Sequence, residues 1–194
     1  MSNNDIVYNL TNPQKSIWLT EQFYSNTPIN NICGSLIIRQ ATDIKLLEKA
    51  INRFIENNDS FKLRFKILND EPVQYFVDDT YYTFDVVDLN SESDIEPIAN
   101  KMVDIPFQIE NSKLFDFKLF KLSNGFGGFI VNVHHIISDA ATFSLIGTEV
   151  VDIYSKLVNN QDIPAKTYSY LDYISSEKEY LSSDRFKKDK DFWN

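Results

Sequence analysis

The feature that most constrains the fold is an apolar, largely β-branched run at residues 129–133, which leads directly into His134 and His135. A nearly continuous apolar run of this kind is typical of a strand that is buried on both faces. We therefore predict a central strand over Phe126–His135, with His135 at its end. Helices are expected to flank the sheet that contains this strand.

His134 and His135 are the only histidines in the chain. Side chains alternate along a strand, so His135 is expected on the face of Val133 and His134 on the face of Asn132. Asp139 follows where the chain turns into the next predicted helix. Two histidines that only fill the core are one interpretation. The alternative is a functional site, because a strand end that opens onto a helix exposes side chains while it holds them rigidly.

A metal centre is not expected at this motif. Zinc requires three or four ligands that converge from one side. Here two histidines diverge, and the single cysteine, Cys33, lies far away in the sequence. We therefore predict no metal site. An unpaired cysteine is typical of a reducing compartment, so a cytoplasmic location is expected.

Length and composition favour a single globular domain without nucleic acid or membrane partners. The 194 residues are 43% hydrophobic and 14% aromatic, which suffices for a core. The net charge of -9 opposes binding to phosphate-rich partners, which attract clustered lysine and arginine. No apolar run approaches the ~18 residues of a transmembrane helix, and the polar start, Met1–Asp5, is not typical of a signal peptide. A local basic cluster, expected on the solvated face of a terminal helix, comprises Arg185, Lys187, Lys188 and Lys190.

The periodicity of apolar residues predicts a mixed α and β fold, with a largely antiparallel sheet flanked by helices in an α/β (α+β) sandwich. Turn residues between 69 and 72 and at Ser123–Gly125 separate pairs of predicted strands. The predicted helices are 13–23, 44–57, 94–103, a long helix after Asp139 and two beyond Pro164. The predicted strands are 32–39, 61–68, 72–77, 82–89, 114–122 and 126–135.

The segment 134–139, His-His-Ile-Ile-Ser-Asp, resembles the HHxxxDG signature of the condensation domains of nonribosomal peptide synthetases. These domains are part of the broader superfamily of chloramphenicol acetyltransferase-like, CoA-dependent acyltransferases. Three further segments are similar to motifs of the same family and follow in the same order. They are 10–18 for the opening motif, 58–65 for the second, and 170–173 with 185–193 for the fourth and the helices after it.

The resemblance covers the whole chain but implies a larger domain. Condensation domains consist of two similar lobes, and residues 1–194 resemble the N-terminal lobe, so the C-terminal lobe is expected to be absent from this chain. In the family, donor and acceptor carrier proteins enter a channel between the lobes from opposite sides. The few residues before Leu10 fit a chain-initiating or trans-acting domain.

The resemblance implies that His135 is the catalytic residue and that His134 is structural. An imidazole, whose unperturbed pKa is about 6.5, can accept a proton from the attacking amine near neutral pH. It can instead position the amine or stabilise the oxyanion of the tetrahedral intermediate. The substrates arrive on phosphopantetheine arms of carrier proteins, so no bound cofactor is expected. An adenylation domain of the same assembly line is a further expected partner.

The remaining motif residues are expected to support His135. Asp139 is predicted to be a buried anchor within salt-bridge reach of Lys62 or Arg64, because a buried carboxylate without a partner is costly. Ser138 is either a polar channel group or, as we prefer, a helix cap. Ala140 replaces the glycine of the signature and is expected to start the helix well, although it is less free to adopt positive φ.

Several functions remain open within this resemblance. The leading one is amide-bond formation by a condensation domain. An epimerisation domain would use the same histidine to move an α-proton, and a stand-alone acyltransferase would use free acyl-CoA. A catalytically silent docking module for carrier proteins is a candidate of a different class. The cyclising relatives replace both histidines with acids, so His134 and His135 exclude that subtype.

Overall fold

The computed structural model describes residues 6–78, 81–164 and 169–193. Their α-helices are α1 (Asn12–Phe23), α2 (Ile44–Asn57), α3 (Ile95–Val103), α4 (Ala140–Val158), α5 (Tyr170–Ser182) and α6 (Asp184–Trp193). The strands are β1 (Val7–Asn9), β2 (Asn31–Ile38), β3 (Leu63–Leu68), β4 (Glu71–Phe76), β5 (Asp85–Leu89), β6 (Phe115–Leu122) and β7 (Gly127–His134). Short 3-10 turns are η1 (Asp59–Lys62), η2 (Glu92–Asp94) and η3 (His135–Ile137).

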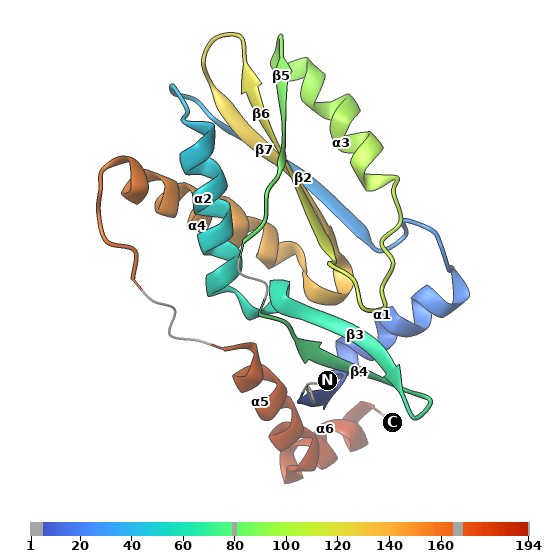
Figure 1. Ribbon diagram of the computed structural model, residues 1–194. Helices are drawn as coiled ribbons and strands as arrows, with labels where there is room; N and C mark the ends of the chain where they lie inside the picture. Colours follow the sequence, from blue (N-terminus) through green and yellow to red (C-terminus); the bar gives the residue numbers. More distant parts are fainter. Residues whose placement is uncertain (1–5, 79–80, 165–168, 194) are drawn as a thin grey trace, which may run out of the picture.

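A four-stranded sheet in the order β2-β7-β6-β5 forms the centre of the fold. The β2–β7 and β6–β7 pairs are antiparallel and the β5–β6 pair is parallel. Every residue of β7 is buried, which confirms the prediction of a central strand buried on both faces. Helix α3 covers one face of this sheet, and α2 and α4 cover the other (Figure 1). The expected sheet flanked by helices is therefore confirmed.

The apolar pattern explains which face of α2 is buried. Leu47, Ile51 and Phe54 recur at helical spacing, and each is fully buried between the sheet and α4. The carboxylate of Asp43 caps the helix by accepting hydrogen bonds from two amide groups of its first turn. The predicted bounds of this helix are correct. It forms, with α4, one wall of the main core (Figure 1).

The strands form two sheets rather than the one that we predicted. The second sheet has the order β1-β4-β3, and its β3–β4 hairpin turns at Asn69 and Asp70, which both adopt positive φ. The chain leaves this sheet after β4 and joins the other at β5. The expected strand 82–89 begins only at Asp85, because the side chain of Asn52 hydrogen-bonds both the backbone N–H and the carbonyl of Tyr82.

The β6–β7 hairpin depends on two glycines. Gly125 adopts a φ of 86° in the turn, a conformation that favours glycine. At Gly128 a Cβ atom would lie 2.0 Å from the carbonyl oxygen of Leu36 on β2, so only glycine allows this approach. The hairpin was predicted at these positions, and its two strands are each shorter by a residue or two than expected.

The two helices expected near the end of the chain are present as α5 and α6. The hydroxyl of Ser169, just before α5, donates to the carboxylate of Asp59 in η1 at 2.6 Å. This hydrogen bond places α5 beside the turn that precedes β3. The basic residues of α6 are exposed, as predicted. Among the described residues, no helix has the length and apolar character needed to span a membrane.

Candidate active site

The two histidines lie on either side of a change in backbone conformation. Strand β7 ends at His134, the 3-10 turn η3 begins at His135, and α4 begins at Ala140. The prediction that His135 continues the strand on the face of Val133 is therefore wrong, because the pleat stops one residue earlier. As a result His134 is 1% exposed, whereas His135 is exposed to solvent.

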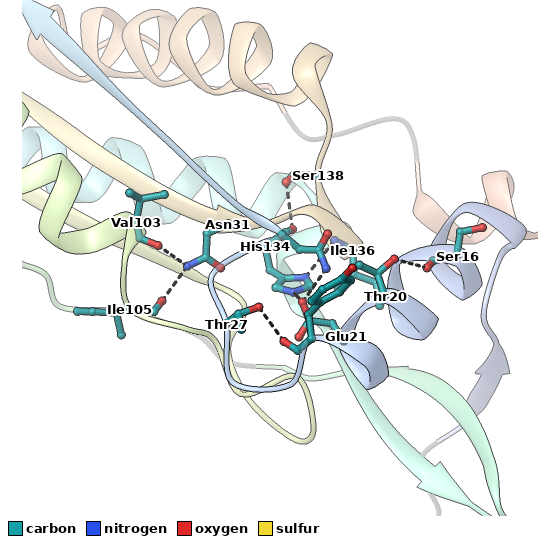
Figure 2. Close-up of polar contacts among 12 residues, drawn as sticks. Ser16, Thr20, Glu21, Thr27, Asn31, Val103, Ile105, His134, Ile136 and Ser138 are labelled. Carbon is teal, nitrogen blue, oxygen red and sulfur yellow. Dashed lines mark hydrogen bonds and ion pairs between the residues drawn. The ribbon is translucent and has the colours of Figure 1, made fainter.

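His134 is held by hydrogen bonds at both ring nitrogens (Figure 2). Its Nδ1 accepts from the backbone N–H of Ile136 at 3.1 Å, and its Nε2 lies 3.0 Å from Oε1 of Glu21. A nitrogen that accepts an N–H carries no proton, so the ring is neutral with its hydrogen on Nε2. Burial lowers the pKa of His134, and the Glu21 carboxylate opposes this shift in part. This geometry supports a structural role.

His135 has the opposite arrangement. Its Nδ1 lies 2.6 Å from the carbonyl oxygen of Ser138, and a carbonyl can only accept, so Nδ1 carries the hydrogen. When the ring is neutral, the lone pair is therefore on Nε2. No residue in the described part of the chain hydrogen-bonds that nitrogen. The backbone N–H of His135 donates to the carbonyl of Asn30 at 2.8 Å, which fixes the turn that presents the ring.

His135 lines a cleft of about 480 Å³ between α1, η3 and α5. Gln14 contributes from α1, Asp139 from the junction with α4, and Tyr170 from α5. A second hollow of about 640 Å³ lies between η1, α4 and α5 and shares Ser60, Tyr170 and Tyr173 with the first. Burial raises the pKa of Tyr170 to about 12, so its phenol stays protonated at neutral pH. The free nitrogen of His135 thus belongs to a residue that faces a space open to a ligand.

Asp139 is not the buried anchor that we predicted. It is exposed and is the N-cap of α4, where it accepts hydrogen bonds from the backbone N–H and the hydroxyl of Thr142 at 2.9 and 2.8 Å. These bonds, the backbone N–H first, lower its pKa. The expected ion pair with Lys62 or Arg64 is absent among the residues described. The helix terminus satisfies the carboxylate locally, so no distant cation is needed.

Lys62 and Arg64 also differ from expectation. The predicted strand 61–68 contained both residues, but Lys62 ends the turn η1 and only Arg64 lies on β3. The Arg64 guanidinium is buried and donates to the carbonyl oxygens of Phe61 and Leu63 and to the hydroxyl of Tyr82. Its observed contacts therefore support the turn before β3 rather than the histidine motif.

Ser138 does not cap α4, but it lines the cleft beside His135, which is consistent with the alternative of a polar channel group. Asp139, and not Ser138, caps α4, so the preferred prediction is wrong. The Ser138 hydroxyl is turned inward and donates to the carbonyl of His134 at 3.1 Å, as Figure 2 shows. Its own carbonyl accepts the hydrogen bond from His135. Ala140 begins α4, as expected.

Two residues at this site were not identified from the sequence, Glu21 and Asn30. Glu21 is buried, and its Oε1 lies 2.6 Å from Nδ2 of Asn30 as well as 3.0 Å from His134. A signal was present, because Gln14, Trp18 and Glu21 form the buried stripe of α1 at helical spacing. An acid on such a stripe indicates a specific partner inside the fold.

The described residues provide neither a cluster of metal ligands nor an activated thiol. Within residues 6–78, 81–164 and 169–193, no three histidine, cysteine or acidic side chains cluster as metal ligands would. Cys33 is half-buried on β2, and burial raises its pKa to about 11. A thiol with that pKa is a poor nucleophile at neutral pH.

The chain belongs to the condensation-domain family of nonribosomal peptide synthetases, since the model of the condensation domain matches residues 4–194. It is 37% identical to surfactin synthase subunit 1 of Bacillus subtilis (strain 168) over 195 residues, which are 96% of this chain and 5% of that protein. It is 31% identical to a plipastatin synthase of the same organism, over 96% of this chain and 7% of that protein. The predicted family is therefore confirmed.

Solved structures agree with this assignment. A crystal structure of a mutant starter condensation domain of rhizomide synthetase, in complex with C8-CoA, matches with a TM-score of 0.86 and 25% identity. The match covers 96% of this chain and 44% of that one. The chloramphenicol acetyltransferase-like fold expected from the sequence is confirmed. The chain spans less than half of the solved domain and a small part of the synthetases.

Proposed function

We propose that this chain supplies one lobe of a condensation domain that forms an amide bond between two carrier-bound substrates. Membership of the condensation-domain family and the likeness to peptide synthetases support this proposal. The observation that carries it is the Nε2 of His135, which has a free lone pair in the neutral ring on a residue that faces the cleft. Residues 1–194 would form the N-terminal lobe, and a second lobe would complete the channel.

The reaction requires one proton acceptor beside the attacking amine. The amine nitrogen of the acceptor attacks the thioester carbonyl of the donor, so a C–N bond forms and the C–S bond breaks. The nitrogen loses a proton to Nε2 of His135, and the proton is returned to the departing thiolate. A base held in this way contributes typically ~10²–10⁴-fold to the rate.

The hydrogen-bonding pattern of His135 favours some of the possible roles over others. Because Nδ1 donates its hydrogen to the Ser138 carbonyl, the neutral ring has only an acceptor at Nε2. An acceptor can take a proton from the amine or hold its N–H in attack geometry. Before it takes that proton, the neutral ring cannot donate to an oxyanion. We therefore assign His135 as the base and positioning group for the amine.

The partners follow from this chemistry. The substrates would arrive on phosphopantetheine arms of donor and acceptor carrier proteins, and an adenylation domain of the same assembly line would load them. No cofactor is needed, since the thioester supplies the activated carbonyl. The cytoplasm is the proposed location, because the carriers and the unpaired thiol of Cys33 fit a reducing compartment. His134, Ser138 and Asp139 would hold the turn that carries His135.

A second candidate differs only in the donor. The starter condensation domain that resembles this chain was crystallised with C8-CoA. A lobe of the same fold could therefore belong to a domain that takes its acyl group from free acyl-CoA. The acceptor amine and the role of His135 would be unchanged. The two candidates are separated by the donor that supports turnover.

The experiment compares the isolated chain with the two-lobed domain that contains it. Donor and acceptor groups are loaded onto carrier proteins, and the condensed thioester is followed by mass spectrometry, with C8-CoA as an alternative donor. We expect product only from the two-lobed form, because two walls are needed to hold both thioesters in attack geometry. Equal turnover by the isolated chain would refute the two-wall argument. The absence of any amide product would leave a docking or epimerisation role.

A further inference from the structure

Glu21 is a buried acid close to the proposed catalytic residue but outside the cleft. It lies on α1, is 8% exposed, and its side chain points toward His134 (Figure 2). It is not among the residues that line the cleft beside His135. Glu21 therefore does not contact a substrate there, and any effect on the reaction must pass through other residues.

The Glu21 carboxylate is hydrogen-bonded by two neutral side chains. The Nε2–H of His134 and the Nδ2–H of Asn30 are its hydrogen-bond donors, at 3.0 and 2.6 Å. His134 is neutral, because its Nδ1 accepts the N–H of Ile136. Among the described residues, no lysine or arginine pairs with this carboxylate. A buried acid without a cation is costly to keep, so its two contacts are expected to serve a purpose beyond packing.

The two contacts lead to consecutive backbone amides. On one branch, Glu21 holds His134, whose Nδ1 accepts the N–H of Ile136 at 3.1 Å. On the other branch, Glu21 holds the side chain of Asn30, whose carbonyl accepts the N–H of His135 at 2.8 Å. One carboxylate thus connects to the amides on both sides of the His135 α-carbon.

The loop that carries Asn30 is itself anchored. The neighbouring Asn31 donates from Nδ2 to the carbonyl oxygens of Val103 and Ile105, at 2.8 and 2.7 Å (Figure 2). These bonds attach the start of β2 to the end of α3. The position of Asn30 is therefore fixed from one side by α3 and from the other by Glu21.

We propose that Glu21 is a positioning residue that, through His134 and Asn30, fixes the turn at residues 135–137 and so orients the His135 ring toward the substrates. The inference rests on the proposed function of His135. It assigns to α1 a direct part in the geometry of the site. Together with the N–H of Ile136, Glu21 sets the Nε2–H tautomer of His134, and it holds the backbone from which His135 projects.

The first test measures this geometry without any turnover. The chain has only two histidines, so ¹⁵N labelling of histidine gives two imidazoles whose tautomers can be read by NMR. We expect the Nε2–H form for His134 and the Nδ1–H form for His135, and a His135→Gln variant assigns the signals. In Glu21→Leu, both rings should become mixtures of tautomers. Unchanged tautomers in a folded Glu21→Leu protein would overturn the proposal, whether or not the domain forms amides.

The second test uses the two-lobed domain and separates geometry from substrate binding. Glu21→Leu should lower kcat by ~10–100-fold, since a displacement of about 1 Å at the reacting groups has an effect of this size, while KM stays nearly constant. Glu21→Gln keeps the accepting oxygen and should restore most of the rate. Gln22→Leu, on the exposed side of the same helix, is the matched control.

If Glu21→Leu does not fold, Asn30→Ala removes one branch alone and should lower kcat by a smaller factor with KM unchanged. A rise in KM at constant kcat would overturn the proposal, because it would indicate an effect on binding. An unchanged kcat in a folded Glu21→Leu or Asn30→Ala protein would overturn it as well. A two-lobed wild-type domain that formed no amide would refute the proposed function, and the NMR measurement would still decide the role of Glu21.

Discussion

His134 and His135 are adjacent and chemically identical, yet they belong to two different regions of the molecule. His134 ends a fully buried strand and faces α1, where both ring nitrogens are hydrogen-bonded. His135 opens a 3-10 turn and lines the cleft, and among the described residues its ring is hydrogen-bonded at Nδ1 alone. Because β7 ends between these two residues, the imidazole of His134 is structural, whereas that of His135 can react with a ligand.

The comparison also shows how a protein assigns tautomers. At His134 the accepting partner, Glu21, is at Nε2, whereas at His135 the accepting partner, the Ser138 carbonyl, is at Nδ1. The position of the acceptor decides which nitrogen keeps its hydrogen. Both ring nitrogens of His134 are therefore hydrogen-bonded within the fold, whereas the neutral ring of His135 offers the lone pair of Nε2 to a ligand.

The largest expected effect is on activity at the cleft side. In the two-lobed domain, His135→Ala should lower amide formation by ~10²–10⁴-fold, because the proton acceptor is removed. Its free energy of unfolding should change by about 0.5 kcal/mol or less, as for most exposed residues. Loaded carrier proteins and urea unfolding measure the two quantities. A normal rate in a folded His135→Ala domain would exclude both a base and a positioning role.

Substitution of the buried histidine, His134, should mainly lower the stability of the fold. His134→Ala leaves the Glu21 carboxylate and the N–H of Ile136 without their partner, which should cost about 3 kcal/mol of stability. Chemical denaturation of the chain measures this loss, and His135→Ala is the matched control. Equal destabilisation by the two substitutions would show that the two regions do not differ as described.

A smaller effect on stability is expected at Asp139, the N-cap of α4. Asp139→Ala removes the N-cap and should lower stability by about 1 kcal/mol, while Asp139→Ser should retain most of it. Lys62→Met should have little effect, and a double-mutant cycle between positions 62 and 139 should show no coupling. A measurable coupling energy between the two positions would contradict this description, because it would indicate an ion pair between Lys62 and Asp139.

The smallest effect is a dependence of stability on pH that originates at His134. Its pKa is lowered by burial from 6.5, so the unfolded chain binds the proton more readily than the folded one. This contribution is complete above pH 6.5 and is lost as the pH falls below it. Asp139, whose pKa is lowered from 3.8, acts in the same direction at more acidic pH. Urea unfolding between pH 7.5 and 5 should show a decline that His134→Gln removes and Asp139→Asn does not.

The sequence predicted the elements with strong local patterns. The bounds of α2 and the centre of the β6–β7 hairpin follow from helical spacing, a cap at Asp43 and a glycine turn. It did not predict two sheets, because strand pairing depends on contacts between distant segments. Nor did it predict the shorter β5, where the side chain of Asn52 takes the backbone hydrogen bonds of Tyr82.

The sequence likewise predicted some features of the candidate site and not others. The histidine motif and its place at the end of a central strand were visible in the sequence. The role of Asp139 was not, because a helix terminus competed with a distant cation and satisfied the carboxylate at lower cost. The pairing of Glu21 with His134 joins residues 113 positions apart. Such contacts leave only a weak trace in the sequence.

The sequence alone determined the family, the central buried strand and the two histidines at its end, since these depend on local pattern and residue type. Only the tertiary structure decided which histidine is buried and which ring nitrogen of each accepts. Those properties depend on where the pleat stops and on which acceptor from another segment reaches each ring. Local propensity sets the strand, but the hydrogen-bond partners that fix a tautomer are brought together only by the fold.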